Sequence, residues 1–108
     1  MSGNSGGSSP SINRPQRGED CRSIFITTHL ASPQAAALAT LSSGDVLHLE
    51  LASDQGPLQA FTADGQLAGN ILSREQSRLI RCILEGVNYQ AEVLEIDGAE
   101  CQIQISAR

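Results

Sequence analysis

Apolar and polar residues alternate in several short runs of this chain, a pattern that predicts strands with one buried face. The clearest run is residues 44–51, GDVLHLEL, in which Leu47, Leu49 and Leu51 fall on one side of an extended backbone. The polar residues between these leucines fall on the other side. We therefore expect a half-buried strand here.

Residues 88–96 and 100–105 alternate in the same way, and Asp97-Gly98 between them is a strong hairpin signal. The apolar side of the last run predicts a buried face comprising Cys101, Ile103 and Ile105. Three further runs, 21–30, 58–62 and 66–71, also have strand composition. Gly69 within the last of these predicts a bulge or a close backbone approach.

Two segments predict helices. In residues 33–41 several alanines and leucines follow Ser32, a good N-cap, and Pro33, which suits the first helical position. The second helix starts near Ser73, where Gln76 completes a capping box, and stops at Gly86. Helical periodicity places an apolar arc on one side of this second helix, comprising Leu72, Leu79, Ile80, Ile83 and Leu84. The opposite side comprises Arg74, Arg78, Arg81 and Glu85.

The predicted order is β-α-β-β-β-α-β-β, an α+β fold rich in β-structure. Six short strands with only two helices predict a small, strongly curved sheet or a partly open barrel. Residues 1–18 are rich in Ser and Gly and poor in apolar residues, so we expect a flexible tail there. Residues 19–108 are then a single small domain, for which a second copy or another partner would add buried surface.

The charge is distributed unevenly between these two parts. The chain has a net charge of −5 and no lysine among its seven basic residues. Residues 1–18 carry two arginines and no acid, whereas 19–108 carry five arginines and twelve acids, a charge of −7. Such an acidic domain disfavours nonspecific binding to nucleic acid and to anionic membranes. No apolar run reaches the length of a membrane span.

The three cysteines, Cys21, Cys82 and Cys101, are odd in number and none forms a C-x-x-C pair. This spacing favours reduced thiols in a cytoplasmic protein. Cys21 is expected to be the easiest of the three to label. The sequence predicts no metal site and no cofactor. It also lacks a nucleophile with a base and an orienting group, so we expect a protein that is not an enzyme.

The arginine side of the second helix is the candidate binding site. A plain solvated face, with an Arg81–Glu85 pair, is the more frequent meaning of such a stripe. However, Arg74 and Arg78 are expected near the positive end of the helix dipole, where cations are unfavourable. Arginines in this unfavourable position indicate a binding site for an anion, either a phosphate or a partner's carboxylate. Tyr89 nearby is a candidate for stacking a nucleobase, although a place in the core or at its edge is the more frequent role of such a residue.

The run of residues 44–96 resembles a HIRAN domain, a small barrel-like module found in some DNA-remodelling helicases. The resemblance rests on GDVLHLEL, on LQAFTADGQLAGNI, and on REQSRLIRCILEGVNYQAEVLEI. It implies a small barrel and recognition of DNA ends by aromatic and basic side chains. The family's Asn-x-x-Asp-x-x-Ala-Ile run is replaced here by SDQGPLQAF, with Ala60-Phe61 in the final pair.

Two functions follow from these observations. The first is a non-catalytic protein-interaction module, an accessory subunit or regulator that acts through a partner protein. The second is a HIRAN-like module that binds DNA ends or single-stranded nucleic acid. The negative charge of the domain favours the first.

Overall fold

The computed structural model describes residues 21–108, so the tail predicted for residues 1–18 lies outside the described residues. Two helices, α2 (Ala35–Leu38) and α3 (Gln76–Leu84), accompany six strands. The strands are β1 (Phe25–His29), β2 (Val46–Leu51), β3 (Leu58–Phe61), β4 (Leu67–Ile71), β5 (Tyr89–Asp97) and β6 (Glu100–Ala107). This order of elements is the predicted one. None of the helices in the described part is long and apolar enough to cross a membrane.

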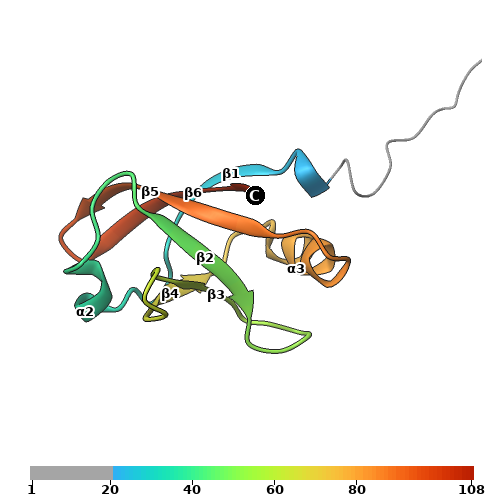
Figure 1. Cartoon of the computed structure of the whole chain (residues 1–108), viewed down its shortest axis with the longest axis horizontal. Coiled ribbons are helices and arrows are strands. Elements are labelled where there is room, and N and C mark those ends of the chain that lie inside the picture. Colours follow the sequence, from blue (N-terminus) through green and yellow to red (C-terminus); the bar gives the residue numbers. More distant parts are fainter. Residues whose placement is uncertain (1–20) are drawn as a thin grey trace, which may run out of the picture.

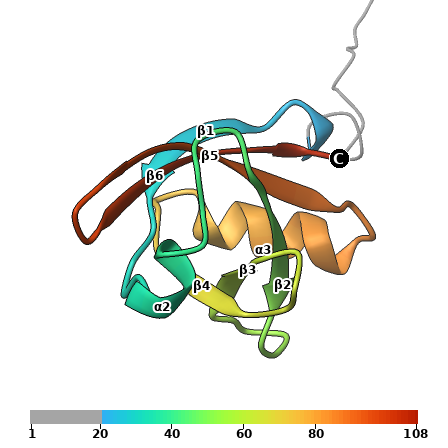
Figure 2. The same ribbon diagram turned by 60° about the vertical axis from the view of Figure 1, so that its left-hand side comes forward.

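The six strands form one antiparallel sheet in the order β1-β6-β5-β2-β3-β4. The sheet curls into a half-barrel, with α3 lying inside the curl and α2 at its other end (Figures 1 and 2). The two edges approach each other where Ala31, just after β1, exchanges two backbone hydrogen bonds of 2.8 Å with Asn70 of β4. The predicted small, curved sheet is therefore confirmed.

The core is aliphatic, as expected from a chain with three aromatic residues. Leu47 and Leu49 of β2 are buried, and Leu51 is half-buried. On β6 the predicted face of Cys101, Ile103 and Ile105 is fully buried. In these two strands, alternation alone predicted the buried side correctly.

The hairpin of β5 and β6 was also predicted, but β5 contains a bulge. Its register shifts between Val93 and Glu95, because Leu94 is an extra residue opposite β6. Alternation before the bulge buries Ala91 and Val93, whereas after it Glu95 is exposed and Ile96 packs against the core. The bulge thereby places Glu95 on the outer side of the hairpin.

Gly69 in β4 meets both expectations for this position. The β3–β4 register shifts between Ala60 and Phe61, directly beside Gly69. A Cβ atom on Gly69 would lie 3.0 Å from the carbonyl oxygen of Ala31 and 3.1 Å from the Cβ of Leu30. The absence of a side chain therefore lets the two edges of the sheet approach.

The predicted helix ends need correction at both N-termini and at the C-terminus of α2, which ends at Leu38 instead of Leu41. Helix α2 spans only Ala35–Leu38, and its N-cap is Gln34 instead of Ser32, which has a positive φ of 48°. Helix α3 has Glu75 as its N-cap, and Ser73 forms no capping box. Instead, the Ser73 hydroxyl accepts a hydrogen bond of 3.1 Å from the Glu75 N–H in a local turn.

The C-terminal end of α3 is where the sequence placed it. Gly86 has a φ of +102°, a conformation that glycine adopts without strain. Its N–H donates to the Ile83 carbonyl, and the Val87 N–H donates to the Cys82 carbonyl. This pair of bonds is the Schellman motif, which satisfies the last carbonyl groups of a helix.

Candidate functional site

The inner side of α3 is centred on Leu79 and Cys82, both fully buried. Ile80 and Ile83 are half-buried on either side of it, as part of the predicted apolar arc. The arc is wrong at its two ends, because Leu72 is 64% exposed and Leu84 is 55% exposed. Cys82 follows Leu79 by three residues and shares its side of the helix, a signal that would have shifted the predicted arc.

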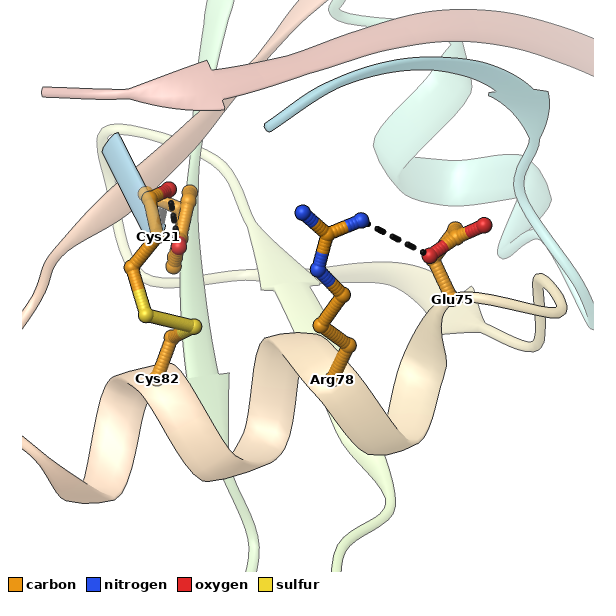
Figure 3. Close-up of a disulfide and its surroundings, with 5 residues drawn as sticks. Cys21, Glu75, Arg78 and Cys82 are labelled. Atoms are coloured by element: carbon orange, nitrogen blue, oxygen red, sulfur yellow. Dashed lines mark hydrogen bonds and ion pairs between the residues drawn. A yellow bond between two sulfur atoms is a disulfide. The ribbon is translucent and has the colours of Figure 1, made fainter. Parts of the chain in front are cut away.

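Cys82 is held by a disulfide bond to Cys21, with a Cα–Cα distance of 5.7 Å (Figure 3). The bond ties the segment before β1 to the middle of α3, across 61 residues of sequence. The expectation of three reduced thiols is therefore wrong, and so is that of an easily labelled Cys21, which is 1% exposed. Cys101 is the free cysteine of the described residues, and it is buried as predicted.

Tyr89 belongs to the same buried contact. Its side chain is 2% exposed, and its hydroxyl donates a hydrogen bond of 2.6 Å to the Cys21 carbonyl oxygen. A buried tyrosine that has found an acceptor for its hydroxyl contributes to the core. Its ring is not available to stack a nucleobase, so Tyr89 lies outside any surface that the arginines form.

The three candidate arginines lie in different surroundings. Arg74 is exposed and precedes the N-cap, so the prediction that it lies in the first helical turn is wrong. Arg78 is in the first turn, and its Nη1 donates to Glu75 Oε1 at 3.4 Å, a contact in which the arginine side chain is 37% exposed (Figure 3). The Glu75 carboxylate offsets the unfavourable dipole at this end of the helix.

Arg81 is exposed on the outer side of α3 and forms no ion pair within residues 21–108. The predicted Arg81–Glu85 pair is therefore wrong. Helical geometry places Arg81 beside Ser77 and Leu84, which are also exposed. Together with the two exposed residues before the helix, they form a surface that we call the α3 surface. It comprises Leu72, Arg74, Ser77, Arg81 and Leu84, and the exposed Glu85 borders it at the C-terminal end of the helix.

Three hollows lie at the other end of the molecule, one of them of about 240 Å³ between the α2–β2 loop and the β3–β4 turn. A polar one of about 90 Å³ is lined by His29, Glu95, Asp97, Glu100 and Gln102. An apolar one of about 350 Å³ lies between α2 and the turn of the β5–β6 hairpin, and we call it the α2 hollow. Its lining residues are Ala35, Leu38, Ala39, Ile96, Gly98 and Ala99.

The histidines do not assemble a reactive centre. His29 is exposed at the end of β1, and His48 is half-buried on β2, opposite Phe61 and Gln90 in the neighbouring strands. Within residues 21–108, no group of three or more His, Cys, Asp or Glu side chains is placed to hold a metal ion. The α3 surface and the α2 hollow are two features of the described part that a partner can contact.

No protein-family model, no curated protein and no solved structure matches this chain, and the resemblance to the HIRAN domain stays a prediction.

Proposed function

We propose that this protein is a non-catalytic interaction module that binds a partner protein through the α3 surface. The observation that supports this proposal is the exposure of Leu72 and Leu84 beside Arg74 and Arg81. Exposed leucines are common singly, but here they accompany arginines whose charges have no partner on the surface itself. Arginine and large apolar side chains are what protein interfaces use, whereas acidic residues are depleted there.

The chemistry of the α3 surface defines the partner as an acidic protein surface with room for an aliphatic side chain. Nucleic acid is the less favoured ligand. Residues 21–108 carry five arginines and ten carboxylates, so the phosphates of an extended strand would meet negative charge beyond the patch. The burial of Tyr89 also removes the aromatic ring that the nucleic-acid hypothesis needs.

A photo-crosslinking amino acid at position 84, introduced in the native host, tests this proposal. We expect one discrete crosslinked product, which Arg74→Gln/Arg81→Gln depletes several-fold while the free energy of unfolding changes by less than about 1 kcal/mol. The same crosslinker at Thr27, exposed on the outer face of β1, is the matched control and should give no such product.

Two outcomes would contradict the proposal. One is an identical set of products at positions 84 and 27, which means that the α3 surface is ordinary solvated surface. The other is binding of short single-stranded or duplex DNA whose affinity falls steeply with salt, which would favour the nucleic-acid module instead.

The compartment is the second part of the proposal. Composition and cysteine spacing favoured the cytoplasm, but the Cys21–Cys82 bond favours an oxidising compartment. Disulfides persist in such compartments and are rare in the cytosol, where thiol systems keep cysteines reduced. We therefore propose that the protein works where this bond is maintained.

Counting reactive thiols tests the bond and the compartment together. Burial raises the pKa of Cys101 above its ordinary value of 9.0, so in mildly alkaline buffer the thiol stays protonated and shielded. With a maleimide and intact-mass measurement we expect no label on the native protein and one in denaturant. Denaturant with a reductant should give three. Three labels in denaturant alone, on protein from acid-quenched host cells, would place it in a reducing compartment.

A further inference from the structure

All five arginines of residues 21–108 belong to α3 or to segments that adjoin it, and we call this part of the molecule the α3 end. Arg74, Arg78 and Arg81 belong to α3 or to the turn before it. Arg22 adjoins Cys21, which is bonded to α3. The Arg108 N–H donates to the carbonyl of Asn88, just beyond the helix, at 3.0 Å.

The opposite end, which we call the α2 end, contains α2 and the turns of the β3–β4 and β5–β6 hairpins. It carries five of the ten carboxylates of residues 21–108 and none of their arginines. These exposed carboxylates are Asp45, Asp64, Glu95, Asp97 and Glu100. The other five carboxylates lie outside the α2 end, so only this end carries charges of a single sign.

The α2 hollow lies at this acidic end. Small side chains, three of them alanines, line its sides, and Leu38 and Ile96 contribute aliphatic surface. Asp97 adjoins one side of the turn that borders the hollow, and Glu100 adjoins the other. A branched aliphatic side chain with a cation one helical turn away would complement this site. Leu84 and Arg81, at the other end of the same protein, have that arrangement.

We propose that the partner of the α3 surface is a second copy of this chain, which receives Leu84 in its α2 hollow. Arg81 then faces the carboxylates that flank the hollow. This inference rests on the proposed function, since it names the occupant of the same surface. The two contact surfaces differ and lie at opposite ends, so the association is head-to-tail. It extends into an open chain of copies instead of stopping at a closed dimer. Its strength falls with salt, because exposed charges contribute to it.

Sedimentation velocity on the full-length protein tests this association. The weight-average mass should rise with protein concentration at low salt and return to that of one copy in strong salt. Leu84→Glu places a carboxylate against the acidic side, whereas Ala35→Glu fills the hollow with a charged side chain where Leu84 should enter. Each should weaken self-association at least about tenfold. Both positions are exposed, so the fold should tolerate the changes. Thr27→Glu adds the same charge elsewhere and should behave as wild type.

Mixing the two variants tests the head-to-tail arrangement. The Leu84→Glu protein keeps an intact hollow, and the Ala35→Glu protein keeps an intact Leu84. A one-to-one mixture should therefore form dimers and nothing longer. A mixture that stays monomeric, while wild type associates, would overturn the arrangement.

The same measurements separate this inference from the proposed function. A wild-type protein that is monomeric at every concentration, while position 84 still crosslinks to a different host protein, overturns the inference alone. A crosslink from position 84 to residues of the α2 hollow in a second copy supports both. No crosslink and no self-association overturn both.

Discussion

Reduction of the Cys21–Cys82 bond should lower the free energy of unfolding by about 4 kcal/mol. The bond spans 61 residues of sequence, so it removes much of the freedom of the unfolded chain. In the chain-entropy description, stabilisation grows with the logarithm of the closed loop, and a loop of this length gives roughly that value. Urea unfolding followed by circular dichroism, with and without a reductant, measures the difference.

The Cys82→Ala variant is the control for this measurement. Its free energy of unfolding should be as low as that of the reduced wild type, and adding reductant should not change it. The free energy of unfolding should also fall more steeply with urea concentration when the bond is absent, since the unfolded chain then exposes more surface. Identical curves for the oxidised and reduced wild type would show that the bond contributes nothing to stability.

Truncation of Leu79 to alanine should cost roughly 2–5 kcal/mol, as cavity-forming changes in a packed core do. Leu79 is fully buried on the inner side of α3, the helix that lies inside the curled sheet (Figure 2). Leu84→Ala is the matched control, because it makes the same change in the same helix at a side chain that is 55% exposed. It should cost less than about 0.5 kcal/mol.

The pair of variants also separates folding from binding. Leu79→Ala should weaken the fold without touching the α3 surface, and Leu84→Ala should leave the fold intact while removing the side chain that a partner receives. Chemical denaturation of both proteins provides the comparison. Equal losses of stability would mean that α3 is rotated from the orientation described above.

Much of the fold follows from local patterns. Alternation predicted the buried faces of β2 and β6, and turn residues predicted the β5–β6 hairpin and the end of α3 at Gly86. These features depend on interactions within a few residues, since a strand has a period of two and a glycine determines the local backbone. The capping predictions failed because a serine hydroxyl can stabilise either a helix N-cap or a non-helical turn. The residue type at positions 32 and 73 therefore does not distinguish the two.

The candidate site was only partly predictable. The sequence identified the second helix and its arginines, but it assigned Arg74 to the first turn and Leu84 to the core. The rotation of α3 about its own axis is fixed partly by the Cys82 disulfide. The sequence does not show that Cys82 is bonded to Cys21. Tyr89 was a candidate for stacking a nucleobase, with a place in the core as the alternative, and only the structure decided for the core. Its hydroxyl acceptor belongs to Cys21, 68 residues earlier in the sequence.

The sequence by itself thus determined the types and order of the elements, because hydrophobic periodicity and turn chemistry are local. Only the tertiary structure decided three other features: the Cys21–Cys82 pair, the bulge that turns Glu95 outward, and the absence of arginines from the acidic α2 end. Each depends on which distant segments pack together. Which distant residues meet depends on the shape of the whole sheet and on what it buries. A short stretch of sequence does not determine either.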